Sequence, residues 1–212
     1  MAVAAKRDTK TAILDAAQKL MAEHGINGVS LRAIMNEAGA NPAALHYHFG
    51  SRESLIEAIL ARHGRRNSER RRAIIEKKLA REITAEIRDV VDALVDPILQ
   101  MLTEEGESGR RFVQFLARLQ SDRTGIHSEL EARNFADVRK GIGQMYAEAC
   151  PHVPQKVKSL RITMAIDSML QSLANADVMS NDWTEAHPGK GLTKFANSLK
   201  DFLVGGLSAD VS

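Results

Sequence analysis

The chain has 212 residues, of which 44% are hydrophobic and 26% are charged. These values are ordinary for a globular protein and argue against a chain that is disordered throughout. No run of about 18 uncharged apolar residues occurs, so the sequence predicts no membrane span. The N-terminal apolar run is too short for a secretory signal, and the single cysteine, Cys150, allows neither an internal disulfide nor a cysteine-based zinc site. We therefore expect a cytoplasmic protein with no membrane partner.

The net charge of +2 hides an uneven distribution of charge along the chain. The first 81 residues carry 15 basic and 8 acidic side chains, whereas the remaining residues carry 14 basic and 19 acidic ones. A basic N-terminal part joined to an acidic remainder indicates that the N-terminal part faces a polyanion.

Apolar residues recur at helical spacing along most of the chain, and no segment has the alternation of a strand. The first predicted helix begins near Thr9 and ends at Gly25, where we expect a positive φ. A second, short helix follows a predicted N-cap at Ser30. A third follows a predicted N-cap at Asn41, with Pro42 in its first position.

The later helices are predicted to be longer. A fourth follows a predicted cap at Ser51 and continues to about Leu79, and a fifth over residues 83–102 contains Pro97 as an expected kink. We expect a polar loop at 104–109 and a further apolar helix face after it. Helices at 130–149 and 154–179, a loop at 181–190 and a last helix ending before Gly205 complete the chain. The prediction is an all-α protein of eight or nine helices.

The second and third predicted helices are separated by residues 38–41, a spacing that matches helix-turn-helix geometry. Ile34, Ala38 and Leu45 would hold the crossing of the two helices. The third helix would present polar and aromatic side chains, which suit phosphates and base edges in a DNA major groove. The alternative is a three-helix packet that only caps a larger bundle.

Residues 11–60 resemble the N-terminal domain of the TetR family of transcriptional repressors. Glycine, cap and aromatic positions agree in register in the segments 13–17, 30–34, 38–39 and 45–55, and at Gly25. The resemblance implies a helix-turn-helix DNA-binding domain over residues 1–62. It also implies a C-terminal helical bundle over residues 63–212 for ligand binding and dimerisation.

The family resemblance implies a set of DNA contacts. Tyr47 and His48 match the aromatic pair that contacts phosphate, and Arg52 matches the basic residue of the fourth helix. The complete expected set is Ser30, Arg32, Asn41, Pro42, Ala43, Ala44, His46, Tyr47, His48 and Arg52. His48 can instead serve packing alone, and Pro42 can serve only as a helix starter.

Other basic residues are expected to act less directly. Lys6, Arg7 and Lys10 could reach a minor groove, although solvated terminal charge is the commoner outcome. The basic run over residues 62–81 predicts a solvated helix face that assists electrostatic steering. The three glutamates of the 104–109 segment are expected to be solvated.

Two further sets of residues follow from apolar patterning in the C-terminal part. A cavity for a small, largely apolar inducer is expected near Met101, Phe112, Phe115, Leu116, Leu119, Met145 and Met164. Plain core packing is the alternative for these residues. A homodimer interface is expected to use Leu160, Met169, Leu170, Leu173, Phe195, Leu199 and Phe202.

The sequence favours a ligand-responsive repressor that binds a palindromic DNA operator as a dimer. No catalytic residue, cofactor or metal site is predicted, because two histidines at the spacing of His46 and His48 point apart on a helix. The rival hypothesis is a helical interaction module, or one that sequesters a small molecule, without an operator.

Overall fold

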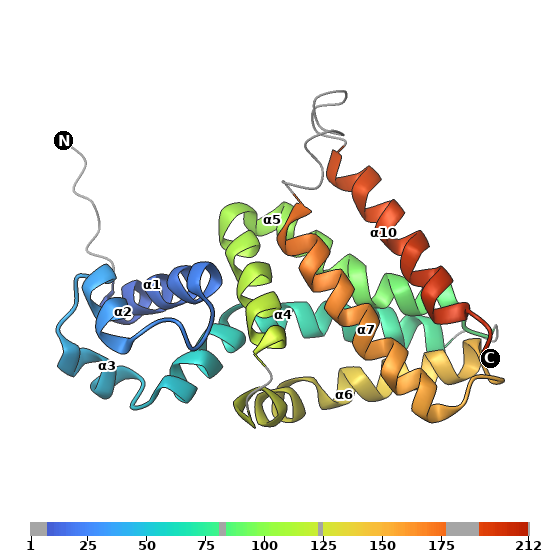
Figure 1. Ribbon diagram of the computed structural model, residues 1–212, viewed down its shortest axis with the longest axis horizontal. Coiled ribbons are helices and arrows are strands. Elements are labelled where there is room, and N and C mark those ends of the chain that lie inside the picture. Colours follow the sequence, from blue (N-terminus) through green and yellow to red (C-terminus); the bar gives the residue numbers. More distant parts are fainter. Residues whose placement is uncertain (1–7, 81–83, 123–124, 177–190, 212) are drawn as a thin grey trace.

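The computed structural model describes residues 8–80, 84–122, 125–176 and 191–211, and only the backbone of 125–135. Within these ranges the chain forms eight helices and no strand, as predicted. A three-helix head and the start of a fourth helix lie at one end of the molecule, and the longer helices form the body (Figure 1). The first four helices are α1 (Thr9–His24), α2 (Leu31–Glu37), α3 (Pro42–His48) and α4 (Arg52–Leu79).

Polar caps begin the short helices where the sequence predicts them. The side-chain oxygens of Ser30 and Ser51 each accept a hydrogen bond of 3.1 Å from the backbone N–H three residues further on. Asn41 accepts one of 2.9 Å from the N–H two residues further on. Gly25 ends α1 with a φ of 82°, a value that favours glycine. All four local predictions are confirmed.

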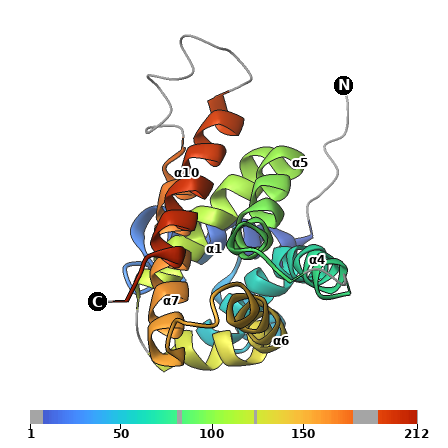
Figure 2. The ribbon, with the colours of Figure 1, turned by 90° about the vertical axis from the view of Figure 1, so that its right-hand side faces the viewer.

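The body consists of α5 (Ile87–Ser121), α6 (Gly125–Ala149), α7 (Gln155–Ala174) and α10 (Gly191–Ser208). Helix α5 is central, since it packs against α1, α4, α6, α7 and α10. The view in Figure 2 looks along α4 and α5, with α6, α7 and α10 around them. Because α4 runs from the head into the body, the two parts share one continuous helix.

The expected loop at 104–109 is wrong, because α5 runs through this segment with a break at one residue. Residues on both sides of Gly106 are helical, and only Gly106 has non-helical dihedrals, with φ 54° and ψ −127°. This combination favours glycine, so a single residue redirects α5 and its two halves run in different directions (Figure 1). Pro97 lies within the first half.

Two predicted helix ends also differ from the structure. Helix α10 continues through Gly205 and Gly206 to Ser208. The hydroxyl of Tyr146 donates to the carbonyl of Leu207 over 2.6 Å, so α6 holds this last turn from outside. Helix α7 ends at Ala174, and the expected loop at 181–190 lies outside the described residues.

Candidate DNA-binding interface and ligand cavity

The head is held together by an apolar core that fixes how α2 and α3 cross. Ile13 and Met21 of α1, Ile34 of α2, Leu45 of α3 and Ile56 of α4 are each at most 2% exposed. Fully burying a side chain of this size contributes about 1.5–3 kcal/mol to stability. The crossing of α2 and α3 is therefore held from within, and their outer faces are left to contact a partner.

The outer face of α3 presents the residues predicted at its start. Asn41, Pro42 and Ala43 are exposed and Ala44 is half-buried. His46 is exposed as well, with its Nδ1 atom 3.3 Å from the carbonyl oxygen of Gly50.

Among the side chains that the structure describes, Tyr47 is the most exposed large hydrophobic one, at 85%. Its ring meets the half-buried His48 ring edge to face, with 5.0 Å between centroids and an angle of 79°. His48 in turn lies 6.2 Å from the Phe49 ring, which packs against the core. A row of rings therefore supports Tyr47 on the side of the core.

The two predicted DNA contacts at the start of α2 differ in whether the side chain already makes a hydrogen bond within the head. The Ser30 hydroxyl accepts the N-cap hydrogen bond, whereas Arg32 is exposed in the first turn. Lys10 is also exposed at the start of α1. Lys6 and Arg7 lie outside the described residues.

The Arg52 guanidinium is hydrogen-bonded to the backbone of the head. Its Nη1 donates to the carbonyl of Ile26 over 2.6 Å, and its Nη2 donates to the carbonyl of Val29. Both carbonyls belong to the segment between α1 and α2. Arg52 therefore ties this segment to α4, a structural role that the sequence did not predict.

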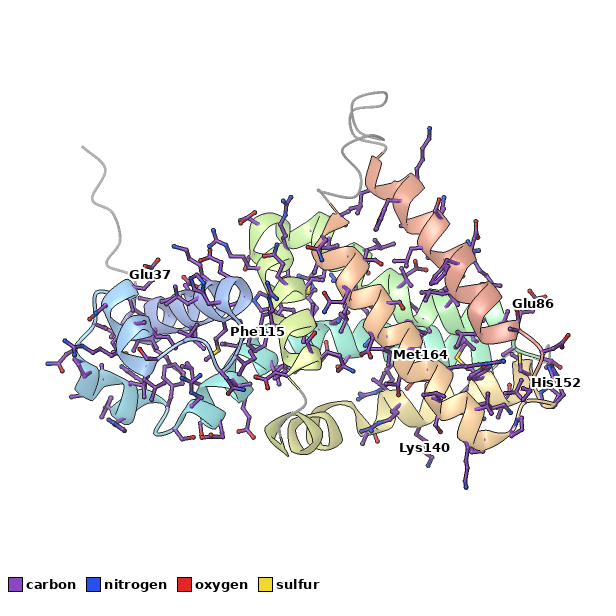
Figure 3. All side chains as sticks on the ribbon, viewed as in Figure 1. Glu37, Glu86, Phe115, Lys140, His152 and Met164 are labelled. Carbon is purple, nitrogen blue, oxygen red and sulfur yellow. The ribbon has the colours of Figure 1, made fainter. Side chains whose placement is uncertain are left out.

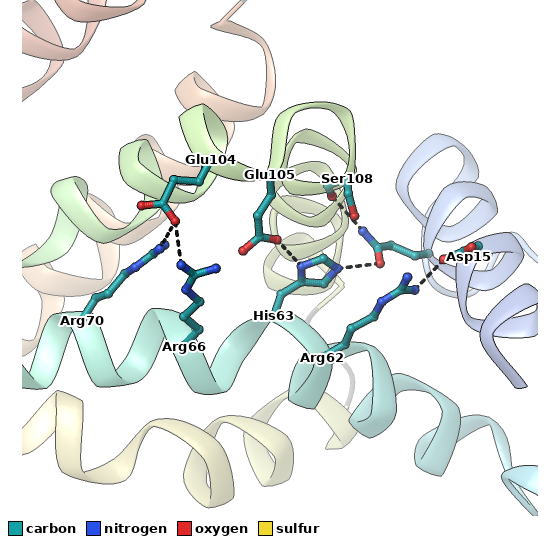
Figure 4. A network of polar contacts seen from close by, with 9 residues as sticks. Asp15, Arg62, His63, Arg66, Arg70, Glu104, Glu105 and Ser108 are labelled. Carbon is teal, nitrogen blue, oxygen red and sulfur yellow. Dashed lines mark hydrogen bonds and ion pairs between the residues drawn. The ribbon is translucent and has the colours of Figure 1, made fainter.

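A polar network joins the head to the body at His63 (Figure 4). His63 is 5% exposed; its Nδ1 lies 2.7 Å from a Glu105 oxygen, and its Nε2 lies 3.0 Å from Oε1 of Gln18. The Gln18 amide nitrogen donates to the carbonyl of Ser108 over 3.1 Å. The network therefore links α1, α4 and the two sides of the Gly106 break in α5.

Burial lowers the pKa of His63, and this effect exceeds the opposing effect of the Glu105 carboxylate. The ring also stacks on Phe112, with 4.5 Å between centroids and an angle of 28°. His63 of α4 is thus enclosed by an aromatic ring and a carboxylate from α5 and by an amide from α1.

Part of the basic run is paired with acidic side chains, whereas Arg65 and Lys77 are exposed as the sequence predicted. Arg62 pairs with Asp15 of α1 at 2.6 Å (Figure 4), and Arg66 and Arg70 both pair with Glu104. Two of the glutamates expected to be solvated, Glu104 and Glu105, are therefore partners of α4. Sequence patterning missed these pairs because the partners are 34 to 47 residues apart.

The body contains a cavity of about 120 Å³ between α4, α5, α6 and α7. Of the predicted pocket residues, Phe112, Leu116 and Leu119 line it. Met101, Phe115 and Met145 are buried in the core and do not line the cavity. Met164 is 58% exposed on α7 (Figure 3), so its predicted place in the pocket is wrong.

Helix α4 supplies a wall that the sequence prediction missed. Leu60, Gly64, Asn67 and Arg71 lie at spacings of four, three and four residues and all line the cavity. This is the spacing of one helix face. This spacing is visible in the sequence, but the many charged residues around these four positions made the segment resemble a solvated helix face.

Arg71 is 7% exposed and interacts with α5. Its Nε donates to the carbonyl of Ala93 over 2.9 Å, and its Nη2 donates to that of Leu94 over 3.1 Å. Ala93 lies four residues before Pro97, whose missing N–H leaves this carbonyl without its helical donor. Arg71 therefore satisfies the carbonyl that Pro97 frees.

The predicted interface residues fall into two groups. Leu160 and Phe202 are 58% and 68% exposed, on α7 and α10. The others are buried or half-buried within one chain, and two of them, Met169 and Leu170, line the cavity. Periodicity could not separate these groups, because an interface residue and a core residue are equally apolar. The other buried or half-buried residues of the predicted interface are Leu173, Phe195 and Leu199.

The described part of the chain contains no group of three or more histidine, cysteine, aspartate or glutamate residues able to hold a metal ion. None of its described helices is both long and apolar enough to cross a membrane.

Comparison with known proteins places this architecture. Residues 13–59 match the model of the bacterial regulatory proteins of the tetR family, and residues 92–206 match the tetracyclin repressor-like C-terminal domain. The transcriptional regulator UidR of Escherichia coli is 38% identical over 68 residues, which are 32% of this chain and 35% of UidR. The match thus spans about a third of that relative's length.

Longer similarities are weaker in sequence. The nicotine-responsive transcriptional repressor HdnoR of Paenarthrobacter nicotinovorans is 23% identical over 166 residues, 75% of this chain and 78% of HdnoR. The crystal structure of Mycobacterium smegmatis AmtR superposes with a TM-score of 0.59 at 18% identity, covering 100% of this chain and 92% of AmtR. This chain belongs to the TetR family of bacterial regulatory proteins.

Proposed function

We propose that the protein is a transcriptional repressor that binds a two-fold symmetric DNA operator as a homodimer and responds to a small ligand. The rival hypothesis, an interaction module without an operator, gives no reason for the exposed outer face of α3. The observation that carries the proposal is Tyr47, a large ring that is 85% exposed on a rigid head. An exposed ring supported by a second aromatic ring suits a contact to the DNA backbone.

The proposed roles of the head residues follow from the exposure of their side chains. Arg32, Tyr47 and His48 are proposed to hold phosphates, because each presents a donor beside the outer face of α3. Asn41, Pro42, Ala43 and Ala44 form the leading turn of α3 and are proposed to enter the major groove. Ser30 supports this face by capping α2, and His46 borders it. We propose residues 1–62 as the DNA-binding part and residues 63–212 as the ligand-binding and dimerisation part.

The proposed dimer face lies on α7 and α10 and is formed by Leu160, Met164 and Phe202. These side chains are 58% to 68% exposed, and Leu160 and Met164 are four residues apart on one helix face. A two-fold copy of the face would cover all three side chains and form a four-helix contact. Such a dimer would place two heads for the two half-sites of one operator.

Selection of genomic fragments with the purified full chain tests the DNA-binding proposal. The wild type should select a two-fold symmetric site, and Tyr47→Ala should weaken binding to all sequences alike with little loss of discrimination. Because Tyr47 is exposed, the variant should unfold at the same urea concentration as the wild type. Wild-type operator affinity in Tyr47→Ala, or equal binding of all duplexes by the wild type, contradicts the proposal.

A further inference from the structure

All charged side chains in the described wall of the cavity are positive. Two arginines, Arg71 and Arg139, line it together with one asparagine and one glutamine. All other lining residues are apolar or glycine, and the described wall contains no aspartate or glutamate. A ligand with an acidic group therefore meets attraction here and no repelling carboxylate in the wall.

Arg71 has no anionic partner among the described residues. Both of its hydrogen bonds go to neutral backbone carbonyls of α5. Burial lowers the pKa of Arg71 to about 10, so the guanidinium still carries its charge near neutral pH. A buried charge is costly unless an opposite charge is close to it. The carbonyls satisfy its N–H groups in part, but they do not neutralise the charge.

Asn67 lies one helical turn before Arg71 and also has a polar atom without a partner. It is 4% exposed, and its Oδ1 is buried without a hydrogen-bond partner in the described structure. Buried side-chain amides are normally hydrogen-bonded. Because residues four apart share a helix face, α4 presents an unneutralised cation and an unpaired acceptor oxygen to the same cavity. The acceptor suits a donor such as water or a ligand hydroxyl, and the cation suits an anion.

The rest of the wall sets the size and character of the ligand. Phe112, Leu116, Ile142 and Ile166 contribute apolar surface. The volume of about 120 Å³ is close to that of a cavity of about 150 Å³ known to hold benzene. An apolar body of about one ring, or a short chain of similar size, fits this space.

We propose that the cavity binds a small organic monocarboxylate, with its carboxylate on Arg71 and its apolar body against the α5 side. The ligand is thus an anionic amphiphile rather than the largely apolar compound expected from the sequence. Its identification as the effector rests on the proposed function, whereas its binding to the cavity does not.

Isothermal titration of the full chain, without DNA, tests the class of ligand. The probes are benzoate and hexanoate, each compared with its neutral amide, benzamide and hexanamide. The wild type should bind each acid about tenfold or more tightly than its amide, the ratio expected for one charge-assisted pair. Arg71→Met should reduce that ratio to about one, and Arg71→Lys should retain part of it.

A matched control comes from the same helix. Arg66 is 64% exposed and does not line the cavity, so Arg66→Met should keep the wild-type preference for acids. Equal binding of acids and amides by the wild type, no binding of either acid at millimolar concentration, or an unchanged preference in Arg71→Met overturns the proposal. If Arg71→Met does not fold, the proposal is tested by the ratio of acid affinity to amide affinity in the wild type and in Arg71→Lys.

Operator affinity, followed by anisotropy with and without benzoate, separates this proposal from the proposed function. Acid-selective binding that leaves operator affinity unchanged supports the cavity chemistry and contradicts the regulatory role. Operator binding without acid-selective binding supports the proposed function and overturns the present inference.

Discussion

The Phe112 ring stacks on the imidazole of His63, with 4.5 Å between the centroids and 28° between the planes. Phe112 lines the cavity, and Nε2 of His63 lies 3.0 Å from Gln18 of α1 in the head. Two side chains therefore connect the cavity wall to the DNA-binding part. A ligand that displaces Phe112 would change the support of α1, provided that it binds the two arrangements with different affinities.

His63→Ala should destabilise the protein by about 1–3 kcal/mol, since it leaves the Glu105 carboxylate and the Gln18 amide without their common partner. The free energy of unfolding in urea measures this effect. His24→Ala is the control, because His24 has a 61% exposed side chain and should change stability by less than about 0.5 kcal/mol. Equal stability of the two variants would show that the network contributes nothing.

The wild type should lose stability as the pH falls below about 6.5, and His63→Gln should lack this component. Burial lowers the pKa of His63 from its ordinary value of 6.5, so between the two pKa values the unfolded chain binds more protons. The free energy of unfolding therefore rises with pH through this window and levels off above it.

Urea titrations of wild type and His63→Gln from pH 5 to pH 8 measure this difference. Glu105 of α5, Asp15 of α1 and Arg62 of α4 also act on the ring, so the comparison is made between variants at each pH. A difference between the two proteins that does not change with pH would contradict the expected burial effect.

Arg52→Ala and Arg32→Ala should have opposite effects on stability and DNA binding. Arg52→Ala removes two hydrogen bonds to the Ile26 and Val29 carbonyls and should cost about 1–3 kcal/mol of unfolding free energy. Arg32→Ala should unfold like the wild type but bind the operator more weakly, with a shallower dependence on salt. Denaturation and anisotropy on both variants check this. The assignment is wrong if Arg52→Ala is as stable as the wild type.

Leu160→Glu combined with Phe202→Glu should give folded monomers with reduced operator affinity. Both side chains are more than half exposed, so the new carboxylates remain solvated in the monomer but meet like charges across the proposed two-fold contact. Leu199→Glu is a poor choice, because Leu199 is 7% exposed in the core of its own chain and the change should unfold it. Light scattering with circular dichroism measures assembly and helicity; a wild-type monomer at micromolar concentration would rule out the dimer.

Features that depend only on neighbouring residues were predictable from the sequence. The caps at Ser30, Asn41 and Ser51 and the end of α1 at Gly25 involve backbone groups within a few residues, so their chemistry is visible in the sequence. The helical period likewise predicted the all-α class. The resemblance of residues 11–60 predicted a family that the comparisons confirm.

The roles of several charged and apolar side chains depend on contacts between distant parts of the chain. Arg52 and Arg71 donate to carbonyls more than 20 residues away, and Glu105 contacts His63 across 42 residues. Tertiary packing therefore gave Arg71 and Glu105, which the sequence predicted to be solvated, roles in the cavity and in the polar network. Met164 and Met169 have the same chemistry and helix, yet one is exposed and the other lines the cavity, because the packing of α7 against α5 selects which face is covered.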